Sequence, residues 1–330
     1  MNLIKFPLGY KAILKMLIRL LRGEKYLSYS FYKNTQKSFR NPECFSVAVN
    51  KKLAIVMQGP YLAEENFTLE SLSRYRKNFP ESVIILSTWS IPECDHVFLK
   101  QIGVQIILNN KPLYVGFANV NLQIVTTKSG MLLARKLGAD YALKTRTDQR
   151  IHHPNFYAYL TSMLEVFPLF SRKYSQHSRL VACSLNTFKL RLYGVSDMFL
   201  FGHIEDMIRY WDLPLDERIP DGSESYKTWR LLSNAKVSEG YFCTQYLQSI
   251  KRDIKYTLDS SLRAISEHFI IIDQHAIGLF WNKYTYDENR YDNGFYNSQL
   301  TFNDWLILHS GKGKINFNEA MLDFKIADGR

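Results

Sequence analysis

An unbroken apolar run, Leu-Ala-Ile-Val-Met at residues 53–57, stops abruptly at Gln58-Gly59-Pro60. A short apolar run that ends in turn-forming residues is typical of a buried strand. Similar runs follow at residues 83–86, 104–108 and 141–145, with helical patterns between them at residues 64–78 and 119–137. This alternation predicts an α/β fold with a mostly parallel sheet and helices on both faces.

The second half of the chain is less regular. Its apolar runs predict strands at residues 180–184, at the end of 193–202 and at 269–273, and helices at 204–210 and 241–250. Ligands of parallel sheets bind beyond the carboxyl ends of the strands, so we expect the functional residues there. Polar residues follow the strands in the first half of the chain: Gln58, Thr88, Asn109, Asn110, Arg146 and Asp148.

The net charge of +11 is concentrated in the first part of the chain. Residues 1–52 carry eleven Lys/Arg and two acids, which leaves a net +2 for the rest. A protein that grips a long polyanion needs a basic stripe on its globular body, so general nucleic-acid binding is disfavoured. The four cysteines lie far apart, which argues against a zinc site or a disulfide framework and suits a reducing compartment.

The N-terminal segment has the pattern of an amphipathic helix. Between residues 3 and 21 the chain is largely apolar, while Lys11, Lys15, Arg19 and Arg22 fall on one helical stripe. These charges rule out an uncharged membrane span, and the pattern of a secretory signal is missing. We expect residues 1–25 to bind an anionic membrane surface peripherally. The alternative is a helix that packs its apolar face on the main domain.

One motif carries the chemistry that the sequence predicts. Arg146 and Asp148 lie two residues apart at the end of the fourth strand and therefore project to the same side. A carboxylate there could hold a hard cation, and a guanidinium could bind phosphate oxygens in bidentate fashion. The alternative is a structural ion pair. The glycine-rich signatures of nicotinamide dehydrogenases and P-loop kinases are missing, as is the nucleophile elbow of serine hydrolases.

Five segments in this order resemble the WavE lipopolysaccharide-synthesis family of bacterial glycosyltransferases. They are residues 55–60, 86–89, 119–123, 143–148 and 195–202, read as IVMQGP, LSTW, NVNLQ, LKTRTD and VSDMFLFG. The resemblance implies a GT-A-like domain that transfers a sugar from a nucleotide-sugar donor to a lipopolysaccharide core or other lipid-linked surface glycan. With the cysteine pattern, the missing export signal and the N-terminal segment, we expect a cytoplasmic enzyme attached peripherally to the inner face of the inner membrane through residues 1–25.

The expected organisation is therefore an arm followed by an enzyme domain. Residues 1–50 form the basic membrane-associating arm and linker, and residues 51–330 form the GT-A-like domain. Its nucleotide-binding half is 51–150, and its acceptor and catalytic half is 151–330. Two other functions remain open: a sugar nucleotidyltransferase, and a catalytically silent membrane-docked glycan-binding protein.

The resemblance also implies a donor site. The residues expected to bind the nucleotide-sugar are Gln58, Gly59, Thr88, Trp89, Asn121, Gln123, Arg146 and Asp148. Folds of this kind usually carry Asp-x-Asp for a divalent metal at the fourth strand end, and here Arg146 occupies the first acidic position. Asp148 alone could anchor Mg²⁺ or Mn²⁺, or Arg146 could replace part of the cation's charge, so metal dependence stays open.

The resemblance also implies a catalytic base near a helix start in the second half, because inverting transferases of this fold commonly use a carboxylate there. Our first choice is Glu239, because its place at a helix start would keep it ionised. Simple N-terminal capping is the alternative role for this acid. Asp197 is the second candidate. Asp273 and His275 are weaker ones, for which a buried structural role is the more natural reading.

Overall fold

A computed structural model describes residues 51–218, 227–282, 299–311 and 318–324. All of them belong to one unit, residues 46–284 and 289–330. The N-terminal arm lies outside the described residues, so its helix and its membrane contact stay predictions. Among the described residues no helix has the length and apolar character needed to cross a membrane.

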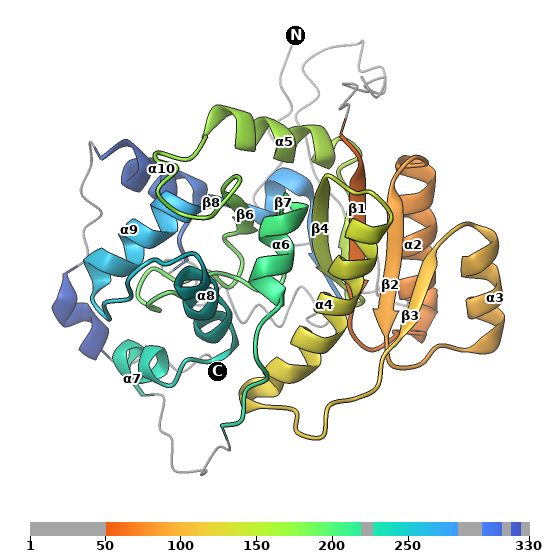
Figure 1. The fold of residues 1–330 in the computed structure, drawn as a ribbon, viewed down its shortest axis with the longest axis horizontal. Coiled ribbons are helices and arrows are strands. Elements are labelled where there is room, and N and C mark those ends of the chain that lie inside the picture. Colours follow the sequence, from red (N-terminus) through yellow and green to blue (C-terminus); the bar gives the residue numbers. More distant parts are fainter. Residues whose placement is uncertain (1–50, 219–226, 283–298, 312–317, 325–330) are drawn as a thin grey trace, which may run out of the picture. The chain divides into compact units, whose positions relative to one another are not determined.

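A seven-stranded sheet forms the centre of this unit, with strand order β3-β2-β1-β4-β7-β6-β8 (Figure 1). Only β7 runs against the other strands. The strands are β1 (Leu53–Gln58), β2 (Val83–Thr88), β3 (Gln105–Leu108), β4 (Tyr141–Arg146), β6 (Leu180–Cys183), β7 (Leu200–His203) and β8 (Phe269–Ile272). Every residue of β1 is buried, because both faces of the sheet are covered.

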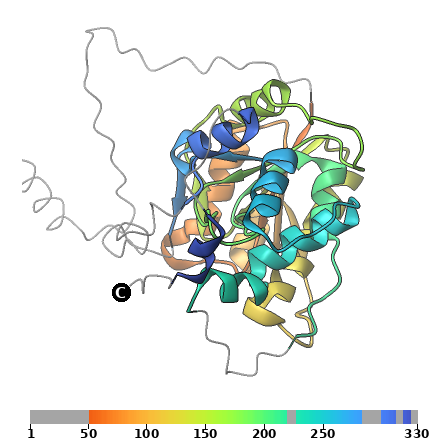
Figure 2. The same ribbon diagram turned by 90° about the vertical axis from the view of Figure 1, so that its left-hand side faces the viewer.

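Helices lie on both faces of the sheet, as Figures 1 and 2 show from two directions. They are α2 (Phe67–Asn78), α3 (Glu93–Gln101), α4 (Val120–Lys136), α5 (Phe156–Val166), α6 (Ile204–Trp211), α7 (Trp229–Asn234), α8 (Ser238–Ser249), α9 (Leu258–His268) and α10 (Phe302–Ser310). α4 and α6 lie side by side on one face, with α8 against α6. Tyr75 of α2 and Phe156 of α5 meet edge to face, 6.5 Å between ring centres.

A second, two-stranded sheet supports the end of β4. β5 (Gln149–Ile151) pairs in antiparallel fashion with β9 (Leu279–Trp281), which places Gln149 opposite Trp281. This pairing brings a distant indole beside the Arg-Thr-Asp segment. Neither three-residue strand was expected from the sequence, because such short strands have no periodic pattern of their own.

The predicted fold class is confirmed as α/β, with a mostly parallel sheet and helices on both faces. The predicted strands and helices of the first half all occur, and their ends differ by a few residues. The sequence pattern missed α3, of which only Leu99 is buried, as well as α5, α7, α9 and α10. The division into halves at residue 150 stays a prediction.

Candidate functional site

The carboxyl edge of the sheet collects the residues that the sequence singled out. β1, β2 and β4 end there, and β7 begins there because it runs in the opposite direction. α4 starts at the same edge, since it follows β3 and precedes β4. Gln58, Thr88, Arg146 and Asp197 therefore lie at one end of the sheet.

Arg146 and Asp148 form a bidentate ion pair. Arg146 Nε donates to Asp148 Oδ1 at 2.8 Å, and Arg146 Nη2 donates to Oδ2 at 2.9 Å. Trp281 Nε1 donates to the same Oδ2 at 3.0 Å. Burial opposes ionisation of Asp148, but the bonds from Arg146 and Trp281 hold the pKa of that carboxyl below its usual value. Asp148 is therefore a fixed carboxylate that aims the guanidinium.

This donor set does not suit a divalent cation. Both carboxylate oxygens of Asp148 already accept hydrogen bonds, and a guanidinium lies directly against them. Mg²⁺ and Mn²⁺ prefer several oxygen ligands without a cation among them. The geometry thus favours the guanidinium over a metal as the positive group at this strand end.

A different cluster has ligand types that suit a metal, but it lies elsewhere. One possible ligand atom from each of His177, His203 and Asp206 lies within 4.8 Å of the others. His203 pairs in the sheet with Tyr141, the first residue of β4, so the cluster is at the amino edge, opposite Arg146. Asp206 there already accepts hydrogen bonds from the backbone N–H groups of His177 and Ser178. An ion in this cluster could not touch a diphosphate at the other edge.

Lys144 is a functional candidate that the sequence reading missed. It is fully buried in β4 on the same side as Arg146, two residues before it. Its Nζ donates to the main-chain oxygen of Asp197 and to Gln123 Oε1 at 3.3 Å, and it lies 4.9 Å from the ring centre of Trp211. Burial lowers the pKa of Lys144 to about 7, although Asp197 works in the opposite direction.

Gln123 connects Lys144 to the carboxylate of Asp197. Its Oε1 accepts from Lys144, and its Nε2 donates to Asp197 Oδ2 at 2.7 Å. Gln123 comes from the first turns of α4, whereas Asp197 comes from the segment before β7. Among the described residues only Oδ2 of this carboxylate has a hydrogen-bond donor, so Oδ1 keeps its lone pairs for a substrate.

Glu239 has both carboxylate oxygens engaged. It lies in the first turn of α8, as predicted, where Oε1 accepts from Asn186 Nδ2 and Oε2 pairs with Arg191 Nη1 at 3.3 Å. Burial raises the pKa of Glu239, Arg191 lowers it, and the nearby charge of Asp197 raises it further. Glu239 therefore anchors the turn that contains Arg191. The contacts favour Asp197 over Glu239 as the carboxylate that meets a substrate.

The carboxylates of Asp197 and Glu239 both act electrostatically on Arg146. Burial alone would lower the pKa of Arg146, but its bond to Asp148 and the charges of Asp148, Asp197 and Glu239 keep it above its usual value. Arg146 therefore stays protonated while it faces these acids. The arrangement places a fixed cation beside candidate bases, which is what transfer from a phosphate leaving group requires.

A profile of the WavE lipopolysaccharide synthesis family matches residues 53–326, which is more than half of the chain. The chain belongs to the WavE family. The match confirms the resemblance that the sequence motifs indicated. None of the curated proteins matches the chain at a significant level.

Solved structures with a similar fold are distant from this WavE protein. One is glucosyl-3-phosphoglycerate synthase from Mycobacterium tuberculosis, in a complex with Mn²⁺, UDP and glucosyl-3-phosphoglycerate. Its identity is 9%, its TM-score is 0.32, and the match covers 63% of this chain and 82% of that one. Another is a glycosyltransferase involved in the glycosylation of the major capsid of PBCV-1. Its identity is 12%, its TM-score 0.34, and the coverage 68% and 82%. Likeness at this level says nothing about substrate.

The first two strand ends of the WavE chain offer mostly buried groups. Gln58 is buried, and its Oε1 accepts from Thr126 of α4 at 2.9 Å. Gly59 has a φ of +125°, and a Cβ there would lie 2.8 Å from Thr147 Oγ1, so the turn requires glycine. Thr88 is buried and Trp89 is partly exposed. Trp89 is therefore the more accessible of the two residues predicted to lie near the base and ribose.

Asn121 has its side chain engaged with two loops. Its Nδ2 donates to the carbonyls of Tyr114 and Asp216, at 3.0 and 2.9 Å, and its Oδ1 accepts from Asp216 N at 2.6 Å. These contacts fix the loop before α4 to the segment after α6. Asp273, a weaker candidate base, accepts from the backbone N–H of Phe302 at 3.2 Å at the start of α10.

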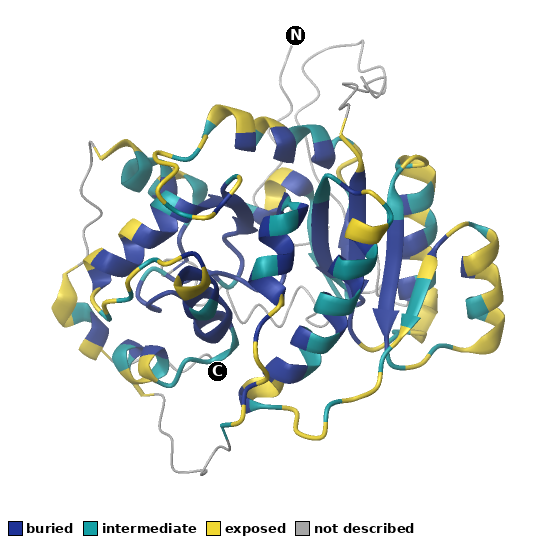
Figure 3. Cartoon of the chain, in the orientation of Figure 1, coloured by how far each residue is buried: buried dark blue, intermediate teal, exposed yellow. Residues whose placement is uncertain are grey.

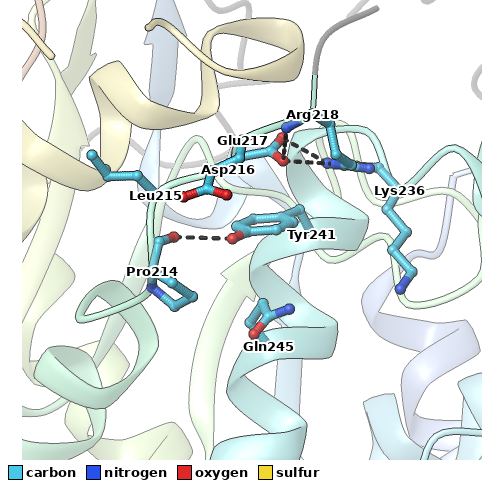
Figure 4. Close-up of a pocket in the computed structure, with 8 residues that line it drawn as sticks. All are labelled: Pro214, Leu215, Asp216, Glu217, Arg218, Lys236, Tyr241 and Gln245. Carbon is cyan, nitrogen blue, oxygen red and sulfur yellow. Dashed lines mark hydrogen bonds and ion pairs between the residues drawn. The ribbon is translucent and has the colours of Figure 1, made fainter. Parts of the chain in front are cut away.

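A hollow of about 450 Å³ borders the first turns of α8 (Figure 4). Its lining residues are Pro214, Leu215, Asp216, Glu217, Arg218, Lys236, Tyr241 and Gln245. Tyr241 lies two residues after Glu239 and donates from its hydroxyl to Pro214 O at 2.9 Å. Arg218 forms two hydrogen bonds to Asp216, at 2.7 and 2.8 Å. The hollow is thus lined in part by α8, the helix that also carries Glu239.

Proposed function

We propose that this chain is a glycosyltransferase that moves a sugar from a nucleotide-sugar donor to a lipopolysaccharide core or another lipid-linked surface glycan. Membership of the WavE lipopolysaccharide synthesis family supports the pathway. The observation that carries the reaction type is the fixed guanidinium of Arg146 at the end of β4, with Lys144 on the same side of the strand and Asp197 beside them. This grouping combines a phosphate-binding charge with a candidate base.

In this proposal Arg146 binds the diphosphate of the donor. The acceptor hydroxyl oxygen attacks the anomeric carbon while the bond from that carbon to the phosphate oxygen breaks. The proton of the hydroxyl passes to Asp197 Oδ1, and the nucleoside diphosphate leaves with the bonding electrons. Arg146 offsets the charge that develops on the leaving group, as preorganised cations do in transferases. Transfer by this route inverts the anomeric configuration.

The remaining predicted residues have supporting places in this scheme. Glu239 fixes Arg191 and the turn around it, while Gln123 orients Asp197. Trp89 is available to the base of the nucleotide. We further propose that the diphosphate is neutralised by protein cations, and that the protein works on the cytoplasmic face of the inner membrane, attached through residues 1–25.

The test is a product assay on purified protein. Thermal shift with UDP-, GDP-, CMP- and dTDP-sugars identifies the donor, because a ligand at 100 times its Kd adds ~2.7 kcal/mol of stability. Incubation of that donor with lipopolysaccharide acceptors should release the nucleotide and extend the glycan. Release of pyrophosphate from a nucleoside triphosphate and a sugar phosphate would instead identify a nucleotidyltransferase. Glycan binding without any product would identify a catalytically silent glycan-binding protein.

A further inference from the structure

The loop before α4 exposes three consecutive large apolar side chains. Leu113 is 88% exposed, Tyr114 67% and Val115 48%, and Leu215 from another segment is 46% exposed. Most side chains of this kind are covered in a folded domain. Figure 3 shows the loop in yellow, at the end of the molecule where α4 begins. We call Leu113, Tyr114, Val115 and Leu215 the apolar lip.

One asparagine, Asn121, forms hydrogen bonds to both segments that carry the lip. Asn121 donates from its side chain to Tyr114 O at 3.0 Å and from its backbone to Val115 O at 3.0 Å. It also exchanges two hydrogen bonds with the backbone of Asp216, the neighbour of Leu215. The two parts of the lip are therefore side by side, and their exposure is built into the fold.

The charge around the lip is suited to an anionic surface. The exposed Lys111 lies two positions before Leu113, and Lys236 lines the same hollow as Leu215. The acidic neighbours come from the other segment. Asp216 is neutralised by Arg218, which leaves the exposed Glu217. Aliphatic side chains with a tyrosine and a flanking lysine match the layers of a bilayer interface, from acyl chains to anionic headgroups.

We propose that the apolar lip inserts into the interface of an anionic bilayer and turns the carboxyl edge of the sheet toward it. The lip lies at the start of α4, the helix that carries Gln123, so its insertion would bring the candidate site close to a lipid-embedded substrate. This contact is separate from the N-terminal arm, and its test needs neither donor nor acceptor. It therefore stands or fails independently of the proposed reaction.

A fluorophore on the lip tests the proposal in the full chain. Leu113→Cys, in a background with Cys44→Ser and Cys94→Ser, is labelled with an environment-sensitive dye. Anionic vesicles of phosphatidylglycerol and phosphatidylcholine should shift the dye emission to the blue, and pure phosphatidylcholine should shift it less. The matched control is Val166→Cys, which is 62% exposed and belongs to α5. The ribbon views place this helix at the opposite end of the described unit from the start of α4. The dye emission at position 166 should not change.

Sedimentation with the same vesicles gives a second measurement. Replacing Leu113, Tyr114 and Val115 together by Ser should weaken partitioning of the full chain at least tenfold, since burial of apolar area drives such insertion. Three outcomes would overturn the proposal: no emission change at position 113 while the protein sediments, equal changes at positions 113 and 166, or no sedimentation at all. A wild-type dimer that the triple substitution makes monomeric would show that a second copy covers the lip.

Discussion

Asp197 and Glu239 differ in how their oxygens are used, and paired amide substitutions separate their roles. Asp197→Asn keeps the bond from Gln123 but removes basicity, so turnover should fall by ~10²–10⁴-fold with donor affinity retained. Glu239→Gln leaves Arg191 without its buried partner, and such a loss typically costs ~3–5 kcal/mol of stability. Turnover, donor affinity and melting temperature are measured for both. A fully active, stable Asp197→Asn variant beside an inactive but stable Glu239→Gln variant would reverse the assignment.

Arg146 should be irreplaceable by lysine. The guanidinium is oriented by the two hydrogen bonds that it donates to Asp148, and a lysine cannot reproduce that fork. Loss of a charge-assisted bond to phosphate is worth ~1.5–3 kcal/mol, so Arg146→Lys should weaken donor binding by roughly 10–100-fold. Calorimetric titration with the donor measures this. EDTA should leave wild-type activity unchanged, because Asp148 has no oxygen to spare. Strong inhibition by EDTA, reversed by Mn²⁺, would contradict the metal-free scheme.

Lys144 should make the free energy of unfolding depend on pH. Its pKa is lowered to about 7 by burial, from 10.5 for an ordinary amine. Between these two values the unfolded chain holds a proton that the folded chain has lost. Stability therefore rises with pH in this window, by at most ~1.4 kcal/mol per pH unit. Lys144→Met removes this contribution.

Urea unfolding at pH 7, 8 and 9 tests this pH dependence. The stability of Lys144→Met relative to wild type should fall as the pH rises. The control is Lys128→Met on α4, a partly exposed lysine that pairs with Asp212. Parallel pH curves for wild type and Lys144→Met would show that Lys144 stays charged.

At the scale of elements, α4 packs on β1 through a glycine. A Cβ at Gly130 would lie well inside van der Waals contact with Val56 Cγ1. Overpacking of this kind costs ~1–3 kcal/mol, more than the ~0.5–1 kcal/mol that alanine gains over glycine in a helix. Gly130→Ala should therefore lower the free energy of unfolding. Gly240→Ala on α8 is the matched control, because its Cβ would meet only Leu192 O at 4.0 Å. Equal stability of the two variants would contradict the tight α4–β1 contact.

The elements also show how far sequence patterns reach. The strands β1, β2 and β4 were predictable because each is an apolar run buried on both faces. α3 was missed because its exposed surface leaves only Leu99 in the core. β5 and β9 were missed because their pairing joins residues that are far apart in the chain, and the indole that holds Asp148 comes from that pairing.

Site residues could be predicted from the sequence where they directly follow a predicted strand. The carboxyl-edge position of Arg146, Asp148 and Gln58 follows from parallel strands alone. The burial of Lys144 does not, because it depends on Trp211 of α6, which the sequence could not place. A lysine inside the otherwise apolar start of β4 was the signal available, since an unpaired charge is rarely buried without a purpose.

At the scale of the whole molecule, the sequence places most of the net positive charge in residues 1–52. If the arm binds anionic lipid through its helical stripe, each basic residue near the surface contributes ~1 kcal/mol. Replacing Lys11, Lys15, Arg19 and Arg22 by Gln should then weaken binding to anionic vesicles by two to three orders of magnitude, ~3–4 kcal/mol. Salt should weaken vesicle binding of the wild type, because it screens the attraction between these four charges and the lipid. The variant lacks the four charges, so salt should have little effect on its binding.

A control variant with the same net charge separates the arm from a general effect of charge. Lys77, Lys100, Lys136 and Arg172 are exposed on the main domain and can be replaced by Gln together. Vesicle sedimentation in low and high salt compares the two variants with wild type at equal protein concentration. The arm is the site of attachment if only its own variant loses binding. Equal loss in both would mean that the vesicles respond to total charge, and the amphipathic arm would then have to be read as a helix that packs on the domain.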